Sequence, residues 1–210
     1  MGATLLEQAK ADVAKDVGTT ILLPSEVRLK VDADAFAALC AANRDMRLER
    51  EADGGLAVMS PASGRSGRRN MELGRQIANW NHTADLGAAF DSSTGFTFPD
   101  GSILAPDAAW TQRERWDRVP VEDQDRFPHI VPDFVAELRS PSDSIKQLQA
   151  KTAHYIAQGV RLGWLIDPTT QTVEIYRPGR DVEILTRPES LSGEEVLPGL
   201  VMDLKGVLFD

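Results

Sequence analysis

Two short apolar stretches of the chain each carry one acidic residue that could do chemistry. Asp107 stands in ILAPDAAW, and Glu137 stands in VPDFVAELRS. FVAEL has apolar residues on both sides of its acid, which predicts a central strand buried on both faces. A buried carboxylate is costly unless a cation neutralises it. Two such acids therefore predict either ion pairs or a site for a hard metal cation.

Basic residues follow the second acid closely enough to complete such a site. Arg139 lies two residues after Glu137, and Lys151 lies in the next expected helix. A positive group beside a metal-binding acid pair can orient an attacking water or stabilise charge on a phosphate. Arginine stays protonated and fork-shaped, so Arg139 is not a simple substitute for a lysine, and Lys151 is favoured. The alternative for Lys151 is an ordinary lysine on the helix surface.

A third acid, Glu72, lies among the apolar positions of the helix predicted over residues 68–87. It either points at the same site or pairs on the helix surface with neighbouring arginines or Gln76. In the first case Glu72 joins Asp107 and Glu137 as a candidate ligand of Mg²⁺ or Mn²⁺.

Length and composition point to one globular domain. The chain has 210 residues; we expect a helical extension over residues 1–20 and a single domain over residues 21–210. No apolar run is long enough to span a membrane, and the polar N-terminus does not resemble a secretory signal. The single cysteine, Cys40, cannot form an internal disulfide. A reducing cytoplasm is the default location.

The formal net charge of −9 argues against a protein that coats nucleic acid without selectivity, because such proteins are usually basic. It does not exclude an enzyme with a local basic groove. The alternative is that the clustered arginines balance nearby acids. The local clusters are Arg65, Arg68 and Arg69 with Arg75, and then Arg113, Arg115 and Arg118.

The first half of the chain supplies a helix, two hairpins and a second helix. An aspartate can cap a helix over residues 35–43. Asp53-Gly54-Gly55 and Asp100-Gly101 are hairpin turn signals. In the helix over residues 68–87, Gly87 is the expected end.

The second half predicts a strand–helix–strand unit. Residues 111–131 form a charged, irregular connection, long enough to be a flap or substrate-contact loop. After FVAELRS, Ser144 with Gln147 fits a capping box, and Gly159 ends the helix. RLGWLIDP and TVEIYRPG then read as paired strands. This order implies a right-handed crossover in a mixed sheet, and the fold class is α/β or α+β with helices packed on that sheet.

Six ordered motifs resemble the Uma-two family of restriction endonucleases. They are ADGGLAVMSPASG, SSTGFTFPDGSILAPDAAW, PDFVAELRSPSDS, KTAHYIAQGVRLGWLIDP, TVEIYRPG and LPGL, and they cover the chain from about Leu22 to its end. That family is assigned to the PD-(D/E)XK nuclease superfamily. The resemblance therefore implies a restriction-endonuclease-like core, a mixed sheet flanked by helices, and a magnesium-type site.

The resemblance also assigns residues to that site. Pro106-Asp107 matches the first half of the superfamily pattern, and Glu137-Leu138-Arg139 stands where (D/E)XK is expected. The third position holds arginine, so Lys151, on the following helix, could place its ammonium at the same point.

The resemblance implies a metal-dependent endonuclease acting on DNA. Since cutting two strands commonly needs two sites, a homodimer is expected, with the N-terminal arm or an edge strand at the contact. The alternative is a catalytically silent relative that binds nucleic acid or a protein partner. The acidic balance and the missing strand lysine favour that alternative.

Overall fold

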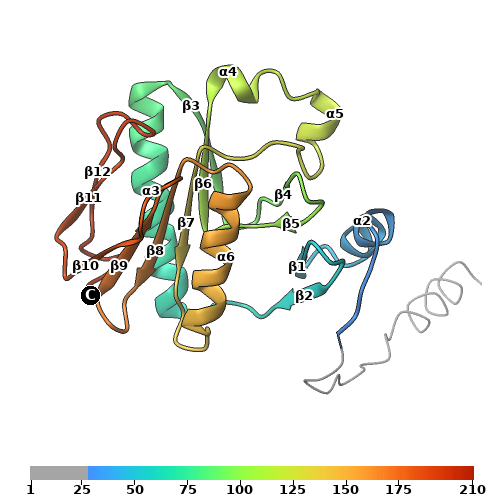
Figure 1. Ribbon diagram of the computed structural model, residues 1–210, viewed down its shortest axis with the longest axis horizontal. Helices are drawn as coiled ribbons and strands as arrows, with labels where there is room; N and C mark the ends of the chain where they lie inside the picture. Colours follow the sequence, from blue (N-terminus) through green and yellow to red (C-terminus); the bar gives the residue numbers. More distant parts are fainter. Residues whose placement is uncertain (1–27) are drawn as a thin grey trace, which may run out of the picture.

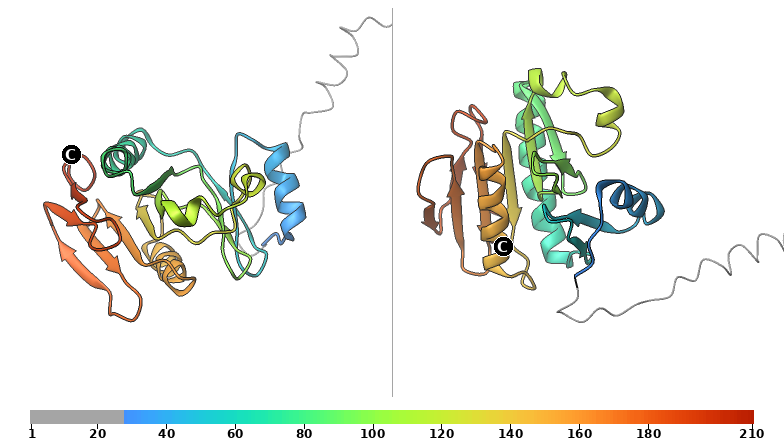
Figure 2. Two further views of the ribbon diagram at one scale, coloured as in Figure 1. Left: turned by 90° about the horizontal axis from the view of Figure 1, so that it is seen from above. Right: turned by 45° about the vertical axis from the view of Figure 1, so that its right-hand side comes forward.

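A six-stranded sheet lies between two long helices, α3 (Gly64–Ala84) and α6 (Ile145–Ala157), in the computed structural model (Figures 1 and 2). The structure describes residues 28–210. The helical extension predicted over residues 1–20, and the start of the domain expected at residue 21, lie outside the described residues.

The six-stranded sheet is mixed, as predicted. Strands β7 (Phe134–Leu138) and β8 (Leu162–Asp167) pair in parallel, and every other neighbouring pair is antiparallel. In spatial order the strands are β10 (Glu183–Thr186), β9 (Thr172–Tyr176), β8, β7, β6 (Ala108–Gln112) and β3 (Gly87–Asp91).

Strand β7 is the buried central strand that the FVAEL sequence predicts, since all five of its residues are buried. Helix α6 connects it to its parallel neighbour β8. Ser144 precedes this helix, but its side chain makes no capping hydrogen bond, so the capping box predicted with Gln147 is not formed. The backbone carbonyl of Ser144 instead accepts from the Gln147 N–H. Gly159, with φ of 110°, follows the end of the helix as expected.

Helix α2 (Ala33–Ala42) is the first element described, and a smaller antiparallel sheet takes two strands from before α3 and two from after it. Both predicted hairpin turns are present, with Gly54 and Gly101 at positive φ. The turn at Gly54 joins the first two strands of this sheet, and the turn at Gly101 lies between its last two strands in the sequence. In spatial order the strands are β2 (Leu56–Met59), β1 (Arg47–Arg50), β5 (Ile103–Leu104) and β4 (Phe96–Thr97).

Helix α3 ends three residues before the glycine that was expected to stop it. Its last residue is Ala84, and Asp85 takes the left-handed conformation at φ of 53°. Gly87 instead begins strand β3, where a Cβ atom would overlap the Thr111 carbonyl oxygen and the Trp110 ring. This glycine is therefore required by close packing against the neighbouring strand.

The connection over residues 111–131 is more ordered than its sequence suggested. It contains two short helices, α4 (Arg113–Trp116) and α5 (Val121–Gln124). Val119 and Ile130 anchor it in the core, because buried apolar side chains can order a segment that has little regular structure of its own.

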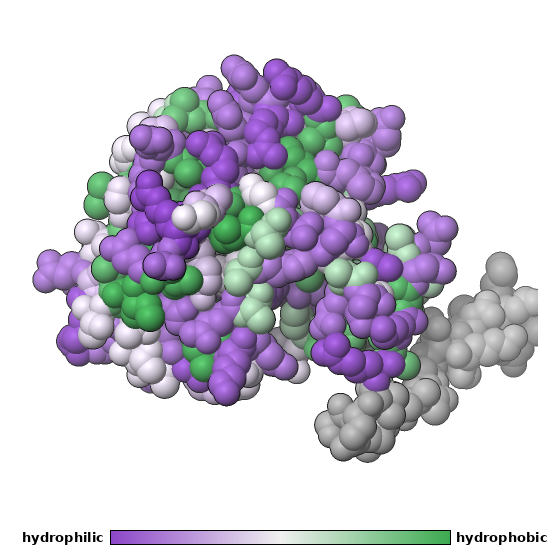
Figure 3. Space-filling model, in the orientation of Figure 1, coloured by the Kyte–Doolittle hydropathy of each residue, from purple (hydrophilic) through white to green (hydrophobic). Residues whose placement is uncertain are grey.

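Apolar side chains fill both faces of the six-stranded sheet. One cluster includes Leu73 and Ile77 of α3 together with the C-terminal segment, where β11 (Ser190–Ser192) pairs with β12 (Val201–Asp203). The other includes Tyr155 of α6. On the molecular face shown in Figure 3, apolar residues form small groups separated by polar ones. Between residues 28 and 210, no helix is long and apolar enough to cross a membrane.

Candidate active site

The two acids singled out in the sequence lie opposite each other at the ends of neighbouring strands. Ala108 of β6 pairs with Ala136 of β7 in antiparallel register, so the next pair outward sets Asp107 opposite Glu137. The Asp107 Oδ2 atom accepts a hydrogen bond of 2.8 Å from the Leu138 N–H. The strand register therefore brings the two predicted acids together.

Lys151 reaches this acid pair from helix α6. Its Nζ atom lies 3.0 Å from Glu137 Oε1, and its side chain is largely buried. Arg139 has different partners: it pairs with Asp167 at 2.7 Å and donates to the Asp143 carbonyl. Of the two basic residues that the sequence offered, the structure places Lys151 beside Glu137.

Glu49, on strand β1, is a further member of this site that the sequence analysis did not single out. It is only 5% exposed. Its Oε1 atom accepts from Lys151 Nζ and from the Ala105 N–H, each at 2.9 Å. We call Glu49, Asp107, Glu137 and Lys151 the acid–lysine cluster. The link between Glu49 and Lys151 spans 102 residues of sequence, which is why periodicity gave no sign of it.

Two polar side chains hold the acids from opposite faces of the sheet. The Tyr155 hydroxyl of α6 donates to Glu137 Oε1 at 2.9 Å. The Asn70 amide of α3 donates to Asp107 Oδ1 at 3.3 Å. The side-chain oxygen of Asn70 is buried and has no hydrogen-bond partner within residues 28–210, so it remains free to accept a bond from a ligand or a water.

Glu72 is not brought to the acid–lysine cluster. It follows Asn70 by two residues, and this spacing turns its side chain by about 200° around the helix. There it accepts hydrogen bonds from Arg75 at 2.9 Å and Gln76 at 3.0 Å. This placement corresponds to the surface pairing that the sequence left open as the alternative.

Burial dominates the electrostatics of the cluster. It raises the pKa of Glu137 to about 7, and repulsion from Asp107 and Glu49 adds to this shift against the opposing effect of Lys151. Burial also raises the pKa of Asp107. Burial would by itself lower the pKa of Lys151, but the two neighbouring carboxylates outweigh it and the pKa is raised. Lys151 therefore stays positively charged, and its single charge faces the three carboxyl groups of the cluster.

Several of the arginines noted in the sequence pair with nearby acids. Arg115 lies 2.7 Å from the buried Asp133. Arg113 pairs with Asp85, and Arg65, Arg68 and Arg69 gather around Asp210. These contacts fit the alternative left open in the sequence, in which the arginines balance neighbouring acids.

The donor set at the cluster fits a magnesium-type ion. Within residues 28–210, His, Cys, Asp and Glu side chains form no group of three or more arranged to hold a metal. Mg²⁺ commonly takes only one or two protein carboxylates and completes its shell with water and phosphate oxygens. Asp107 and Glu137 supply such a pair, and the unpaired Asn70 oxygen beside Asp107 is suited to accept from a water.

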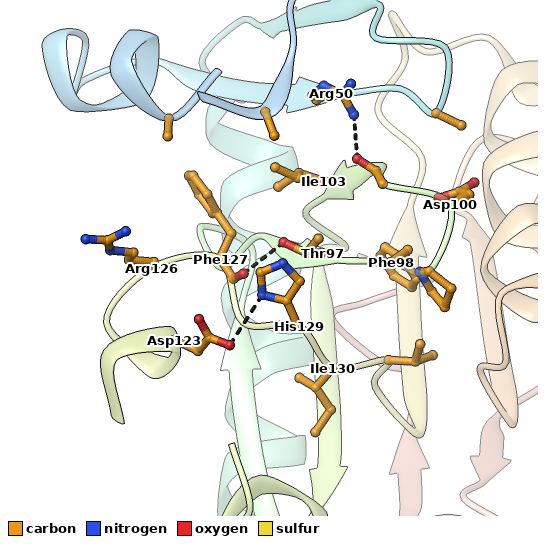
Figure 4. A pocket seen from close by; sticks show the side chains of 16 residues that line it. Arg50, Thr97, Phe98, Asp100, Ile103, Asp123, Arg126, Phe127, His129 and Ile130 are labelled. Carbon is orange, nitrogen blue, oxygen red and sulfur yellow. Dashed lines mark hydrogen bonds and ion pairs between the residues drawn. The ribbon is translucent and has the colours of Figure 1, made fainter. Parts of the chain in front are cut away.

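The acid–lysine cluster opens on a cavity of about 520 Å³. Asp107, Glu137 and Lys151 line it, together with serines from the loops around it. A different cavity, of about 630 Å³, lies between α2, β1 and the segment after α5 (Figure 4). No cluster residue lines that second cavity. Its Arg50 donates to the Gly101 carbonyl at 2.6 Å and its His129 faces Asp123.

A mixed sheet flanked by helices, with two acids at adjacent strand ends and a lysine beside them, is a restriction-endonuclease-like arrangement. The family model for Uma2, described as a putative restriction endonuclease, matches residues 33–205. The chain belongs to this family, which confirms the resemblance seen in the sequence.

A solved structure supports the same fold. The chain is similar to a protein from Anabaena variabilis described as a putative nuclease belonging to DUF820. The TM-score is 0.64 at 25% sequence identity, and the match covers 77% of this chain and 89% of the other. A comparison with curated proteins gives no match.

Proposed function

We propose that this protein is an endonuclease that hydrolyses DNA phosphodiester bonds with Mg²⁺ or Mn²⁺. The observation that carries the proposal is the 3.0 Å contact between Lys151 Nζ and Glu137 Oε1, directly beside Asp107 at the end of the neighbouring strand. Membership of the Uma2 family supports the same activity.

Each member of the cluster has a distinct role in this proposal. Asp107 and Glu137 would hold the metal, which when bound lowers the pKa of a coordinated water and neutralises charge on the phosphate. Lys151, kept charged by its two carboxylate neighbours, would orient the attacking water or stabilise negative charge in the transition state. Tyr155 fixes the Glu137 carboxylate through its hydroxyl. Glu72 and Arg139 have no part, because other side chains engage them.

Cleavage of supercoiled plasmid and of single-stranded DNA, with Mg²⁺ or Mn²⁺, tests this proposal. Asp107→Asn, Glu137→Gln and Lys151→Met keep the shape of each side chain and remove its charge. We expect each to lower the cutting rate by about 10²- to 10³-fold, the usual effect of removing one preorganised electrostatic group.

Glu72→Gln and Arg139→Lys are the matched controls and are expected to keep most of the activity. Arg139→Lys retains a cation for the buried Asp167, so the fold is preserved. Absence of cutting by the wild-type protein on every substrate would instead favour the catalytically silent nuclease-fold protein, which binds nucleic acid or a protein partner. Cutting that survives both acid substitutions would count as contamination and lead to the same conclusion.

We also propose that two copies associate, so that each strand of a duplex meets its own acid–lysine cluster. Strand β10 forms an edge of the six-stranded sheet, and its Ile184 is 62% exposed. An unpaired strand edge is a ready surface for pairing with another chain. Sedimentation equilibrium at micromolar concentration is expected to show a dimer for the wild type and a monomer for Ile184→Lys. A wild-type monomer would overturn this part of the proposal.

A further inference from the structure

A third cavity meets the one at the acid–lysine cluster. It has a volume of about 630 Å³ and lies between helix α3 and strand β3. Four residues line both cavities: Arg47, Ala62, Asn70 and Asp107. The two cavities therefore adjoin at these residues, with Asp107 among them. We call the cavity along the helix the α3 groove, lined by Arg47, Gly67, Asn70, Gly74, Ala78 and Asp91.

Arg47 places a positive charge at the junction of the two cavities. It stands two positions before Glu49 on strand β1, so both side chains leave the same face of the strand. It forms no ion pair with any residue from 28 to 210, yet it is close enough to act electrostatically on both Asp107 and Asp91. An arginine without a carboxylate partner, beside a candidate phosphodiester site, is suited to bind a phosphate.

The α3 groove is open along the helix. Gly67 and Gly74 are seven residues apart and therefore share one helix face. A Cβ atom added at either position would have no neighbour within 4 Å. A chain lying in the groove could thus approach the helix backbone closely.

Acidic charge also lies near the junction end of the groove, because Asp91 of β3 pairs in register with Ala108, the residue after Asp107. Asp91 lines the groove, and its Oδ1 atom accepts from the Ser93 N–H at 3.0 Å and from the Ser93 hydroxyl at 2.6 Å. Arg75 also lines the groove, but it is paired with Glu72. Of the two arginines that line the groove, Arg47 is consequently the one with no ion pair among residues 28–210.

We propose that the α3 groove holds the sugar–phosphate backbone of the DNA strand on one side of the bond that is cut, with Arg47 binding the phosphate adjacent to it. This inference rests on the proposed nuclease function. A DNA strand that is cut at Asp107 must extend from the site in two directions. The cavity at the acid–lysine cluster can hold the strand on only one side of the cut bond. The α3 groove begins at the same aspartate and supplies the other.

Charge introduced at Gly74 tests the path directly. Gly74→Lys and Gly74→Glu place opposite charges in the groove, and Gly74→Ala adds only a methyl group. DNA affinity is measured by fluorescence anisotropy with a labelled duplex, in Mg²⁺ and in the Asp107→Asn background, in which cutting is expected to be slow. Gly74→Lys should tighten binding, and Gly74→Glu should weaken it. The slope of log K against log salt should steepen by about one for the lysine variant, as for one added phosphate contact.

Ala157→Lys and Ala157→Glu are the matched controls. Ala157 is an exposed residue at the end of α6, and these variants make the same changes in net charge away from the groove. The inference would be overturned if the Ala157 variants changed DNA affinity as much as the Gly74 variants, or if Gly74→Lys and Gly74→Glu changed it in the same direction.

Plasmid cutting, measured without the Asp107→Asn substitution, separates the two proposals. If the protein cuts DNA but the Gly74 substitutions leave DNA affinity unchanged, only the proposal about the groove is rejected. If the Gly74 substitutions change DNA affinity as expected but the protein does not cut, the nuclease activity is rejected and the groove remains a DNA-binding surface.

Discussion

Three carboxylates share one ammonium in the acid–lysine cluster, and this imbalance has consequences for each residue in it. Glu137 is 4% exposed and lies beside two other acids. Such an arrangement is unfavourable in the metal-free protein and becomes favourable when a cation is bound. Functional sites commonly sacrifice stability in this way.

Glu137 should make the metal-free protein less stable as the pH rises. Its folded pKa of about 7 lies above the ordinary value of 4.5, so the folded state binds more protons between these two values. The free energy of unfolding contributed by this group therefore falls as the pH rises from 4.5 to 7 and is constant outside that window. Urea unfolding in EDTA between pH 5 and pH 8 should show a fall of about 2–3 kcal/mol that Glu137→Gln removes. Parallel curves for the two proteins would refute the prediction.

Glu49 should act on catalysis by holding Lys151 in place. Glu49→Gln keeps an oxygen that can accept from both Lys151 and Ala105 but removes the charge, whereas Glu49→Ala removes both. We expect the glutamine variant to lower kcat by about tenfold and the alanine variant by about 100-fold, the range found for groups that orient a catalytic residue. KM for DNA should be little changed in both. An increase in KM at constant kcat would assign Glu49 to substrate binding instead.

The residues of the site were predictable only where local pattern determined their position. Asp107 and Glu137 could be found because each interrupts an apolar strand, and antiparallel pairing then set them side by side. Spacing also made Glu72 and Arg139 candidates, with Lys151 preferred to Arg139 and a surface pairing left open for Glu72. Their nearest partners, Arg75 and Asp167, turn both to other contacts. The role of Glu49 depends on a tertiary contact with Lys151, which no local pattern encodes.

At the scale of the elements, two glycines should respond in opposite ways to the same substitution. Gly74→Ala should stabilise the protein by about 0.5–1 kcal/mol, because alanine suits the interior of α3 and its methyl group meets no neighbour. Gly87→Ala should destabilise it by about 3 kcal/mol or more, because the methyl group would overlap Thr111 and Trp110 and disrupt the pairing of β3 with β6. Thermal unfolding of both variants beside the wild type measures the difference. Similar effects of the two substitutions would contradict the packing at β3.

The same glycines show why some element boundaries were predictable and others were not. Gly54 and Gly101 lie in turns whose conformation depends on adjacent residues, so the sequence located them correctly. The sequence placed Gly87 at the end of α3. The structure instead requires glycine there because a side chain would overlap Trp110, on a strand more than twenty residues away. Likewise, α4 and α5 form within the connection over residues 111–131, where the sequence carries no strong helical periodicity.

At the scale of the whole molecule, divalent metal should stabilise the folded protein. Asp107 directly precedes β6 and Glu137 lies in β7, two adjacent internal strands of the six-stranded sheet, so an ion bound between them contributes to the stability of the fold. A ligand that binds only the folded state stabilises it by about 2.7 kcal/mol at a concentration of 100 times its Kd. At pH 8, the wild-type melting temperature should therefore rise progressively with added Mg²⁺ or Mn²⁺. The Asp107→Asn, Glu137→Gln double variant should melt at one temperature throughout the titration, although its sheet is intact. If both proteins respond equally, the ion binds elsewhere on this acidic surface, and the assignment of the metal to the strand ends is wrong.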